Sequence, residues 1–270
     1  MPVPGTISFL TDYGLADGFV GVCHGVIARI SPGTRVIDLT HLVAPGDVRQ
    51  GAALLAQAVA YLPPAVHLAV VDPGVGGPRR PIALRAGGQL LVGPDNGLLL
   101  EAAETLGPLD GAWELTEAQL MLPHTAATFH GRDVFAPVAA HLATGVPVER
   151  VGPALDPGTL VRLPAAVSRI ESATAYGEVT LVDRYGNIQT SLTAAQLAEV
   201  GAAPGVTLLV EIDGGGWRAA YGRTFGDVDR GRLVGLVDSA GRFALAINIG
   251  NAASYLGLTP GDQLTVRVDQ

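Results

Sequence analysis

Strand-like and helix-like segments alternate through the first half of the chain, and this alternation constrains the fold more than any other feature. Helices with apolar residues at helical spacing follow Asp17 and Asp47, residues that can cap a helix. Predicted strands lie at 6–10, 35–39, 66–71, 81–84 and 89–92, and a further helix lies at about 133–142. Such alternation is typical of an α/β fold with a mostly parallel sheet and helices on its faces.

The pattern changes after this half. Proline and glycine punctuate residues 152–173, as is common in a linker. Beyond it, strands are predicted at 177–182, 205–212, 233–237, 242–247 and 263–268, with one helix near 193–200. We therefore expect an N-terminal α/β domain at 1–160, a linker at 161–169 and a smaller β-rich C-terminal domain at 170–270.

Charge and cysteine content limit the classes of partner. A formal net charge of −8 argues against general binding to nucleic acid or to anionic membranes, because such binding depends on Lys and Arg. We expect no membrane span, since no apolar run reaches about 18 residues, and no signal peptide, since the sequence does not start with a basic stretch followed by an apolar one. Cys23 is the only cysteine, which excludes an internal disulfide and suggests a reducing, cytoplasmic setting.

Two aspartates, Asp12 and Asp72, end predicted parallel strands, and each is followed by a glycine-containing segment, Tyr13-Gly14 and Pro73-Gly74 respectively. Ligands bind at the carboxyl ends of strands in open α/β sheets, although an Asp–Gly pair there can also be a simple turn or cap. Arg79 follows Asp72 across a short Gly-Pro loop, so the two side chains can converge. Pairing would hold the carboxylate in its charged form; the alternative is an ordinary surface ion pair.

His130 is the one histidine with a distinctive setting, directly before a predicted helix. The other histidines, His24, His41, His67, His124 and His141, show no such context. No paired-histidine helical motif occurs, so we expect no metal site. The chain also lacks a phosphate-binding loop, a dinucleotide fingerprint and a serine nucleophile elbow.

Three turn-like segments of the second half carry polar groups that can bind a ligand. Asp183 and Asn187 flank one turn, and a carboxylate and an amide there suit an ammonium group and a purine edge. Ser239 lies in a segment, 238–241, that we expect to form a type I′ or similar hairpin turn. Asn248 follows the next strand. Taken singly, each segment is equally a plain turn.

Considered together, these segments resemble one family over residues 5–268. The motifs occur in the family's order: Thr11-Asp12-Tyr13-Gly14, Val71-Asp72-Pro73-Gly74-Val75-Gly76, Arg79, Gly93-Pro94-Asp95-Asn96-Gly97, Thr128-Phe129-His130-Gly131-Arg132-Asp133 and Asp183-Arg184-Tyr185-Gly186-Asn187. The chain is similar to the S-adenosylmethionine hydroxide adenosyltransferases, the hydrolase branch of the superfamily that contains the fluorinase and the chlorinase.

The resemblance implies hydrolysis of S-adenosylmethionine to adenosine and methionine, with no cofactor or metal. It also implies a barrel-like C-terminal domain and a homotrimer whose substrate lies between the N-terminal domain of one subunit and the C-terminal domain of its neighbour. Asp72, Arg79 and His130 would position the attacking water. The implied substrate contacts are Asp12 for the ribose, Asp183 for the ammonium, Ser239 for the carboxylate, and Asn187, Phe225 and Asn248 for the adenine or nearby atoms.

Two positions depart from the fluorinase pattern. Gly131 stands where the fluorinase has a serine that helps to hold fluoride, and Ala240 stands where it has an arginine. The chlorinase also has glycine at the first position, so Gly131 alone does not exclude chloride. Two alternatives to the hydrolase therefore stay open: a chlorinase-type halogenase and a non-catalytic protein that binds an adenosyl ligand.

Overall fold

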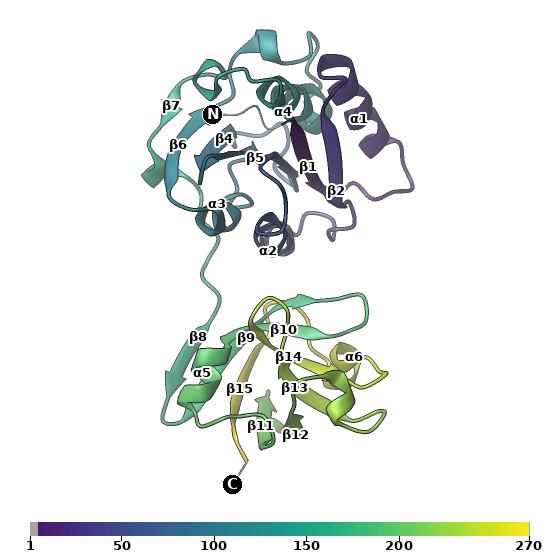
Figure 1. Ribbon diagram of the computed structural model, residues 1–270, viewed down its shortest axis with the longest axis vertical. Coiled ribbons are helices and arrows are strands. Elements are labelled where there is room, and N and C mark those ends of the chain that lie inside the picture. Colours follow the sequence, from purple (N-terminus) through teal and green to yellow (C-terminus); the bar gives the residue numbers. More distant parts are fainter. Residues whose placement is uncertain (1–4, 270) are drawn as a thin grey trace. The chain divides into compact units, whose positions relative to one another are not determined.

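The computed structural model describes residues 5–269 of the chain. Contacts divide the chain into two compact units, Met1–Leu163 and Pro164–Gln270 (Figure 1). The division falls inside the segment 161–169, where the sequence predicts a linker. Each unit has its own sheet and core, and each is described separately.

The N-terminal unit is built on a seven-stranded sheet in the order β2-β1-β3-β5-β4-β6-β7. The pairs β2–β1, β1–β3 and β3–β5 are parallel, and β4, β6 and β7 extend the sheet in antiparallel pairs. The α/β class is thus confirmed. The strands are β1 (Thr6–Thr11), β2 (Arg35–Thr40), β3 (Val66–Val70), β4 (Pro81–Ala86), β5 (Gln89–Pro94), β6 (Leu109–Glu114) and β7 (Ala154–Leu155).

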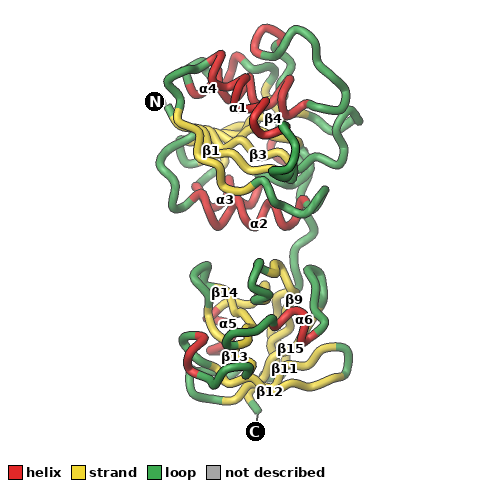
Figure 2. The backbone as a smooth tube through the Cα atoms, turned by 90° about the vertical axis from the view of Figure 1, so that its right-hand side faces the viewer, coloured by secondary structure: helices red, strands yellow, loops and turns green. Residues whose placement is uncertain are grey.

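Helices cover both faces of this sheet (Figure 2). Ile7 and Phe9 of β1 share a core with α1 and α4, whereas Leu10 of the same strand packs with α2 and α3. Because successive strand residues point to opposite faces, a strand buried on both faces is mostly apolar, and Ser8 and Thr11 are the buried polar residues of β1. The helices are α1 (Phe19–Ile30), α2 (Val48–Val59), α3 (Leu100–Leu106) and α4 (Ala136–Ala143), with short turns η1 (Ala118–Leu120), η2 (Gly131–Phe135), η3 (Val148–Arg150) and η4 (Pro157–Thr159).

The two predicted helix caps have different outcomes. Asp47 caps α2, because its Oδ1 accepts a hydrogen bond from the Gln50 amide at 2.9 Å. The prediction for Asp17 was wrong: α1 begins at Phe19, its N-cap residue is Gly18, and no side chain caps it.

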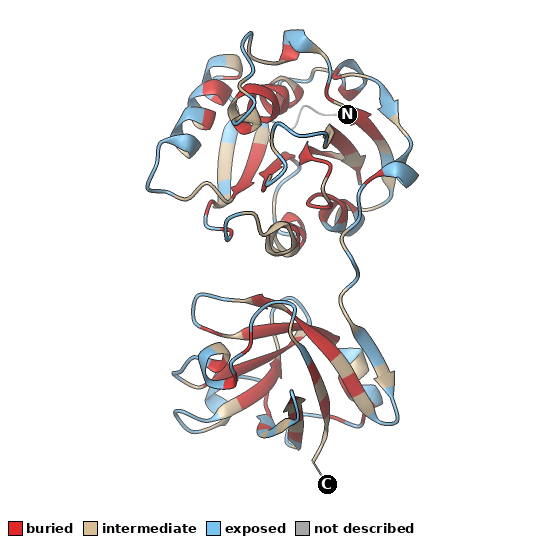
Figure 3. Cartoon of the chain, turned by 180° about the vertical axis from the view of Figure 1, so that it is seen from behind, coloured by how far each residue is buried: buried red, intermediate tan, exposed pale blue. Residues whose placement is uncertain are grey.

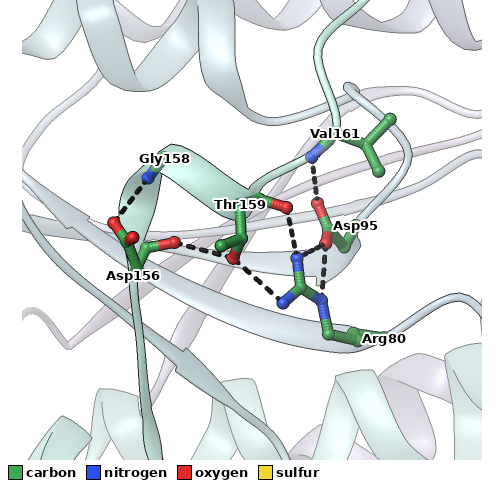
Figure 4. Close-up of polar contacts among 6 residues, drawn as sticks. All are labelled: Arg80, Asp95, Asp156, Gly158, Thr159 and Val161. Atoms are coloured by element: carbon green, nitrogen blue, oxygen red, sulfur yellow. Dashed lines mark hydrogen bonds and ion pairs between the residues drawn. The ribbon is translucent and has the colours of Figure 1, made fainter.

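A buried carboxylate at the end of β5 fixes the last part of the unit (Figure 4). Asp95 Oδ2 accepts hydrogen bonds from Arg80 Nε at 2.9 Å and Nη2 at 2.5 Å, and Oδ1 accepts one from the Val161 amide at 2.9 Å. Arg80 also donates to the Thr159 carbonyl at 2.7 Å. These charge-assisted bonds tie residues 159–161 to the sheet.

The C-terminal unit contains an eight-stranded sheet in the order β10-β14-β13-β12-β11-β15-β9-β8, and the pairing of β9 with β10 closes seven of these strands into a barrel. β10 and β14 are buried at five of their six positions, whereas β11 alternates between buried and more exposed residues; Figure 3 shows the burial along these strands. The strands are β8 (Ser168–Glu171), β9 (Thr174–Val182), β10 (Ile188–Thr193), β11 (Thr207–Ile212), β12 (Gly215–Tyr221), β13 (Leu233–Val237), β14 (Arg242–Ile247) and β15 (Gln263–Val268); the helices are α5 (Ala194–Glu199), α6 (Ala252–Leu256) and the short η5 (Phe225–Asp227).

The hairpin between β13 and β14 is not a type I′ turn, which requires positive φ at Ser239 and Ala240. Only Gly241 has a left-handed conformation there, with φ 74°. Asp238 Oδ1 accepts the amides of Ala240 and Arg242 at 2.9 and 3.0 Å, so the side chain stabilises a longer turn with glycine at its end.

No helix among residues 5–269 has the length and apolar character needed to span a membrane.

Candidate functional site

The two strand-end aspartates of the N-terminal unit lie at the same edge of the sheet. Asp12 follows β1, and Asp72 follows β3 after Val71. The two strands are parallel neighbours, with Thr11 paired to Val70. Their carboxyl ends therefore meet, as expected for a binding edge in an α/β sheet.

The loop that carries Asp12 is fixed by hydrogen bonds to the segment after β2. Asp12 Oδ2 accepts the Gly46 amide at 2.8 Å, and the Gly14 amide donates to the His41 carbonyl at 2.7 Å. The Thr11 hydroxyl oxygen accepts the Tyr13 amide at 3.2 Å. The carboxylate thus has a defined orientation before any ligand binds.

Asp72 and Arg79 form a tight, nearly buried ion pair. Arg79 Nε lies 3.0 Å from both carboxylate oxygens, and Nη2 lies 2.5 Å from Oδ2. Only 5% of the Asp72 side chain and 10% of the Arg79 side chain are exposed. The guanidinium also lies 5.4 Å from the Phe135 ring centroid, within range of a cation–π contact. This is no solvated surface pair, so its geometry is well defined.

Arg79 also contacts His130, which comes from a distant segment. Nη2 lies 2.7 Å from His130 Nδ1. A guanidinium has no acceptor, so Nδ1 must accept this bond, and a neutral His130 carries its proton on Nε2. Burial lowers the pKa of His130 below its ordinary 6.5, and the Arg79 charge lowers it further, against the opposite effect of Asp72 and Asp133. Burial and the Arg79 charge both favour the neutral imidazole.

The π-helical turn η2 holds His130 in place. Asp133 in this turn is fully buried and accepts the Ala126 amide at 2.7 Å and Arg132 Nε at 2.6 Å. Burial raises the pKa of Asp133, but the hydrogen bonds from Arg132 and the Ala126 amide outweigh it, so the net shift is downward. Single π turns are frequent at functional sites, because they re-aim the side chains around them.

Tyr13 and Gly131 fit together beside these residues. A Cβ atom at position 131 would lie 1.8 Å from the Tyr13 hydroxyl oxygen and 2.9 Å from Cζ. The Tyr13 ring packs edge-on against Phe19 and Phe129, with centroids 6.2 and 5.6 Å away. Residue 131 therefore has to be glycine while the tyrosine keeps this position. The sequence reasoning singled out Gly131 but missed Tyr13, which has no signal of its own.

Burial raises the pKa of the Tyr13 phenol strongly, and the charges of Cys23, Asp12 and Asp72 act in the same direction against that of Arg79. The phenol therefore stays protonated and is electrostatically coupled to the aspartates of the site.

In the C-terminal unit, Asp183 and Asn187 form one hydrogen-bonded turn between β9 and β10. Asp183 Oδ1 accepts the Tyr185 and Asn187 amides at 2.8 and 2.9 Å, and Oδ2 accepts Asn187 Nδ2 at 2.7 Å. Gly186 has φ 81°, and a Cβ there would lie 2.1 Å from the Asn251 side chain. The turn is therefore packed against the segment after β14.

Of the remaining sequence-predicted residues of this unit, two are exposed and Asn248 is half-buried. Ser239 is exposed at the tip of the β13–β14 hairpin, and Phe225, 47% exposed, begins η5. Asn248 Nδ2 donates to the Val228 carbonyl at 2.7 Å, so this amide supports a loop of its own unit. The structure thus brings together Asp72, Arg79 and His130 in one unit and Asp183 with Asn187 in the other.

Each of the two units matches the model of a known sequence family. A family model for the N-terminal domain of S-adenosylmethionine hydroxide adenosyltransferases matches residues 7–152, and one for the C-terminal domain matches residues 177–265. The chain belongs to the S-adenosylmethionine hydroxide adenosyltransferase family. A family relative from Salinispora tropica, named (R)-S-adenosyl-L-methionine hydrolase, is 57% identical over 96% of this chain and 97% of its own length.

Other matches span a range of identity. A protein of the same name from Thermus thermophilus is 44% identical over 94% of this chain and 96% of its own length, whereas a fluorinase from Nocardia brasiliensis is 27% identical over 97% and 96%. A solved structure of an uncharacterized conserved protein from Thermotoga maritima superimposes with a TM-score of 0.92, at 38% identity over 97% of this chain and 99% of that one.

The close fit of Tyr13 to Gly131 predicts that adding one methyl group at position 131 destabilises the protein. Gly131→Ala should lower the free energy of unfolding by about 2 kcal/mol, because the packed tyrosine has to move. Gly21→Ala is the matched control: it adds the same methyl group to α1 where nothing lies within 4 Å, and should be neutral or stabilising.

Denaturant unfolding measures both variants, and Tyr13→Ala supplies the background that tests the contact. The loss from Gly131→Ala should be much smaller in Tyr13→Ala than in the native chain. An equal loss in both backgrounds would show that the tyrosine is not the obstacle.

Proposed function

We propose that this protein hydrolyses S-adenosylmethionine to adenosine and methionine by in-line attack of water on C5′. The single observation that carries the proposal is the contact of Arg79 with both Asp72 and His130, in a chain of the hydroxide adenosyltransferase family. The similarity to proteins named as hydrolases over nearly the whole chain supports the same reaction.

The chemistry of the substrate defines what the site has to supply. Methionine leaves a sulfonium as a neutral thioether, so the leaving group needs no acid. The barrier lies in holding a weakly nucleophilic water in line with C5′, and fixed near-attack geometry can lower such a barrier by roughly 7–11 kcal/mol. The bond forms from the water oxygen to C5′, the C5′–sulfur bond breaks, and one proton leaves the water.

The hydrogen-bond directions assign roles to the three residues. His130 Nδ1 is occupied by Arg79, and Nε2 carries the proton, so neutral His130 acts as a hydrogen-bond donor toward the water. Arg79 adds positive charge that stabilises the developing hydroxide. Asp72 is the acceptor of the set, and we assign it the proton from the attacking water.

Binding roles follow the family resemblance. Asp12 holds the ribose hydroxyls, Asp183 the methionine ammonium and Ser239 the methionine carboxylate. Asn187 faces the adenine edge, Phe225 stacks on the ring and Asn248 makes a further contact. Because Ala240 offers no charged group, the carboxylate depends on Ser239 and backbone amides. No metal or cofactor enters the proposed reaction.

The geometry around Gly131 argues against a fluorinase, and the set of Asp72, Arg79 and His130 argues against a halogenase of either kind. Position 131 cannot hold a serine hydroxyl while Tyr13 occupies its place, and a halide would need no proton acceptor such as Asp72. A set of acid, guanidinium and imidazole suits water instead. A protein that only binds the ligand would have no catalytic use for Asp72, Arg79 and His130.

Incubation with S-adenosylmethionine, followed by chromatography, tests the proposal. We expect adenosine and methionine at a rate independent of chloride, and Asp72→Asn, Arg79→Ala and His130→Ala should each lower kcat at least ~100-fold. Arg162→Ala is the matched control, since this arginine forms an exposed pair with Glu104. Formation of 5′-chloro-5′-deoxyadenosine, or tight binding without turnover, would refute hydrolysis.

We also propose that the enzyme acts in the cytoplasm as a homotrimer, with each active site shared between neighbouring subunits. The support is the family resemblance and, for location, a single buried cysteine. Refolding equal amounts of Arg79→Ala and Asp183→Ala chains together tests the sharing. Random trimers should then contain about a quarter of sites with both residues intact, and should recover activity in that proportion. No recovery, with trimers present by light scattering, would place the whole site within one chain.

A further inference from the structure

Three side chains outside the proposed catalytic set converge at the edge of the N-terminal sheet. His24 lies on α1, Asp38 on the edge strand β2, and His41 directly after that strand. His24 Nε2 lies 2.9 Å and His41 Nε2 lies 3.0 Å from the same oxygen, Asp38 Oδ1. One potential ligand atom from each residue lies within 4.8 Å of the others.

His41 is the informative member of this group. Its side chain is only 3% exposed, yet its Nε2 has no hydrogen-bond partner, because the nearby Asp38 oxygen is not aligned with it. Its Nδ1 is engaged with the Thr11 hydroxyl at 2.9 Å. If Nδ1 carries the proton, the lone pair of Nε2 faces a carboxylate oxygen. A buried nitrogen left in this state is costly.

The surroundings hold the two imidazoles in place and leave a path to solvent. The Phe9 ring packs against both, with centroids 5.9 Å from His24 and 4.8 Å from His41. His24 and Asp38 are 34% and 44% exposed, so an ion can enter from their side and keep a water ligand. The ligand atoms of His24, Asp38 and His41 therefore have the Phe9 ring on one side and solvent on the other.

We propose that His24, Asp38 and His41 bind a divalent transition-metal ion of the Zn²⁺ class. Two imidazole nitrogens and one carboxylate oxygen are ligands that Zn²⁺ accepts, with a solvent molecule completing four-coordination. Tetrahedral coordination at ligand distances of about 2.0–2.2 Å places the ligand atoms about 3.3–3.6 Å apart, so each imidazole nitrogen has to move a few tenths of an ångström away from the Asp38 oxygen. The two nitrogens, which lie within 4.8 Å of each other, have to take up the same spacing. The Thr11 hydroxyl, as acceptor for His41 Nδ1–H, orients the ring as partners of ligating histidines commonly do.

The bound ion would brace the loop that carries Asp12. His41 accepts the Gly14 amide through its carbonyl, and Thr11 contacts both His41 and the Tyr13 amide. An ion that fixes His41 thereby fixes the start of this loop. The site uses none of Asp72, Arg79 and His130, and its test measures binding alone, so it stands or falls separately from the proposed hydrolysis.

Titration of the EDTA-treated full chain with Zn²⁺ in a calorimeter, and with Co²⁺ followed by visible absorption, tests the site. We expect saturable binding of one ion per chain and a rise in Tm. His24→Ala and Asp38→Asn should each weaken binding by at least ~10-fold. His124→Ala, which removes an exposed histidine outside the group, should leave the affinity unchanged.

Circular dichroism verifies that each variant is folded. Absence of saturable binding, or an affinity in His24→Ala equal to that of the native chain, would overturn the proposal. Loss of binding in His124→Ala instead would place the ion elsewhere and would overturn it equally.

Discussion

The Arg79 guanidinium is the group on which the rest of the site depends. One nitrogen, Nη2, contacts both the Asp72 carboxylate and the His130 ring, and these residues come from a strand end and from a turn 51 positions further along the chain than Arg79. Because the pair with Asp72 is nearly buried, removal of either partner would leave an uncompensated charge. The same contact sets the tautomer of His130, since an arginine can only donate. The Arg79 guanidinium therefore fixes the position of the Asp72 carboxylate and the tautomer of His130. It also places a positive charge beside the proposed nucleophile.

The fold serves this arrangement in two ways. Parallel pairing of β1 and β3 places Asp12 and Asp72 at one edge of the sheet, where loops rather than strands surround a ligand. The π turn η2 then places His130 against Arg79 and keeps Gly131 under Tyr13. The tyrosine fills the space that a side chain at 131 would occupy, so packing alone keeps a serine hydroxyl out of this position.

Sequence reasoning found those parts of the structure that have local signals. Apolar runs ending in Asp12 and Asp72 marked β1, β3 and the binding edge, and Asp47 marked the start of α2. The contact of Arg79 with His130 followed only from family resemblance, because no pattern encodes contacts between distant segments. Strands β10 and β12 were missed, since Gln, Thr and Ser interrupt the apolar pattern of β10 and Gly and Arg that of β12; barrel closure nevertheless buries most of β10. The convergence of His24 and His41 on Asp38 was also not predicted. His24 lies on a different element from the other two residues, and no sequence pattern encodes contacts between distant segments.

Nitrogen-15 NMR of the histidine imidazoles tests the central contact most directly, with His130 assigned by its absence in His130→Gln. The account predicts a neutral ring protonated on Nε2, with Nδ1 unprotonated and hydrogen-bonded, and a pKa below 6.5 because burial and Arg79 both disfavour the imidazolium. Arg79→Ala should raise that pKa. A ring protonated on Nδ1, or a pKa above 6.5 in the native chain, would contradict the arrangement of Asp72, Arg79 and His130 described above.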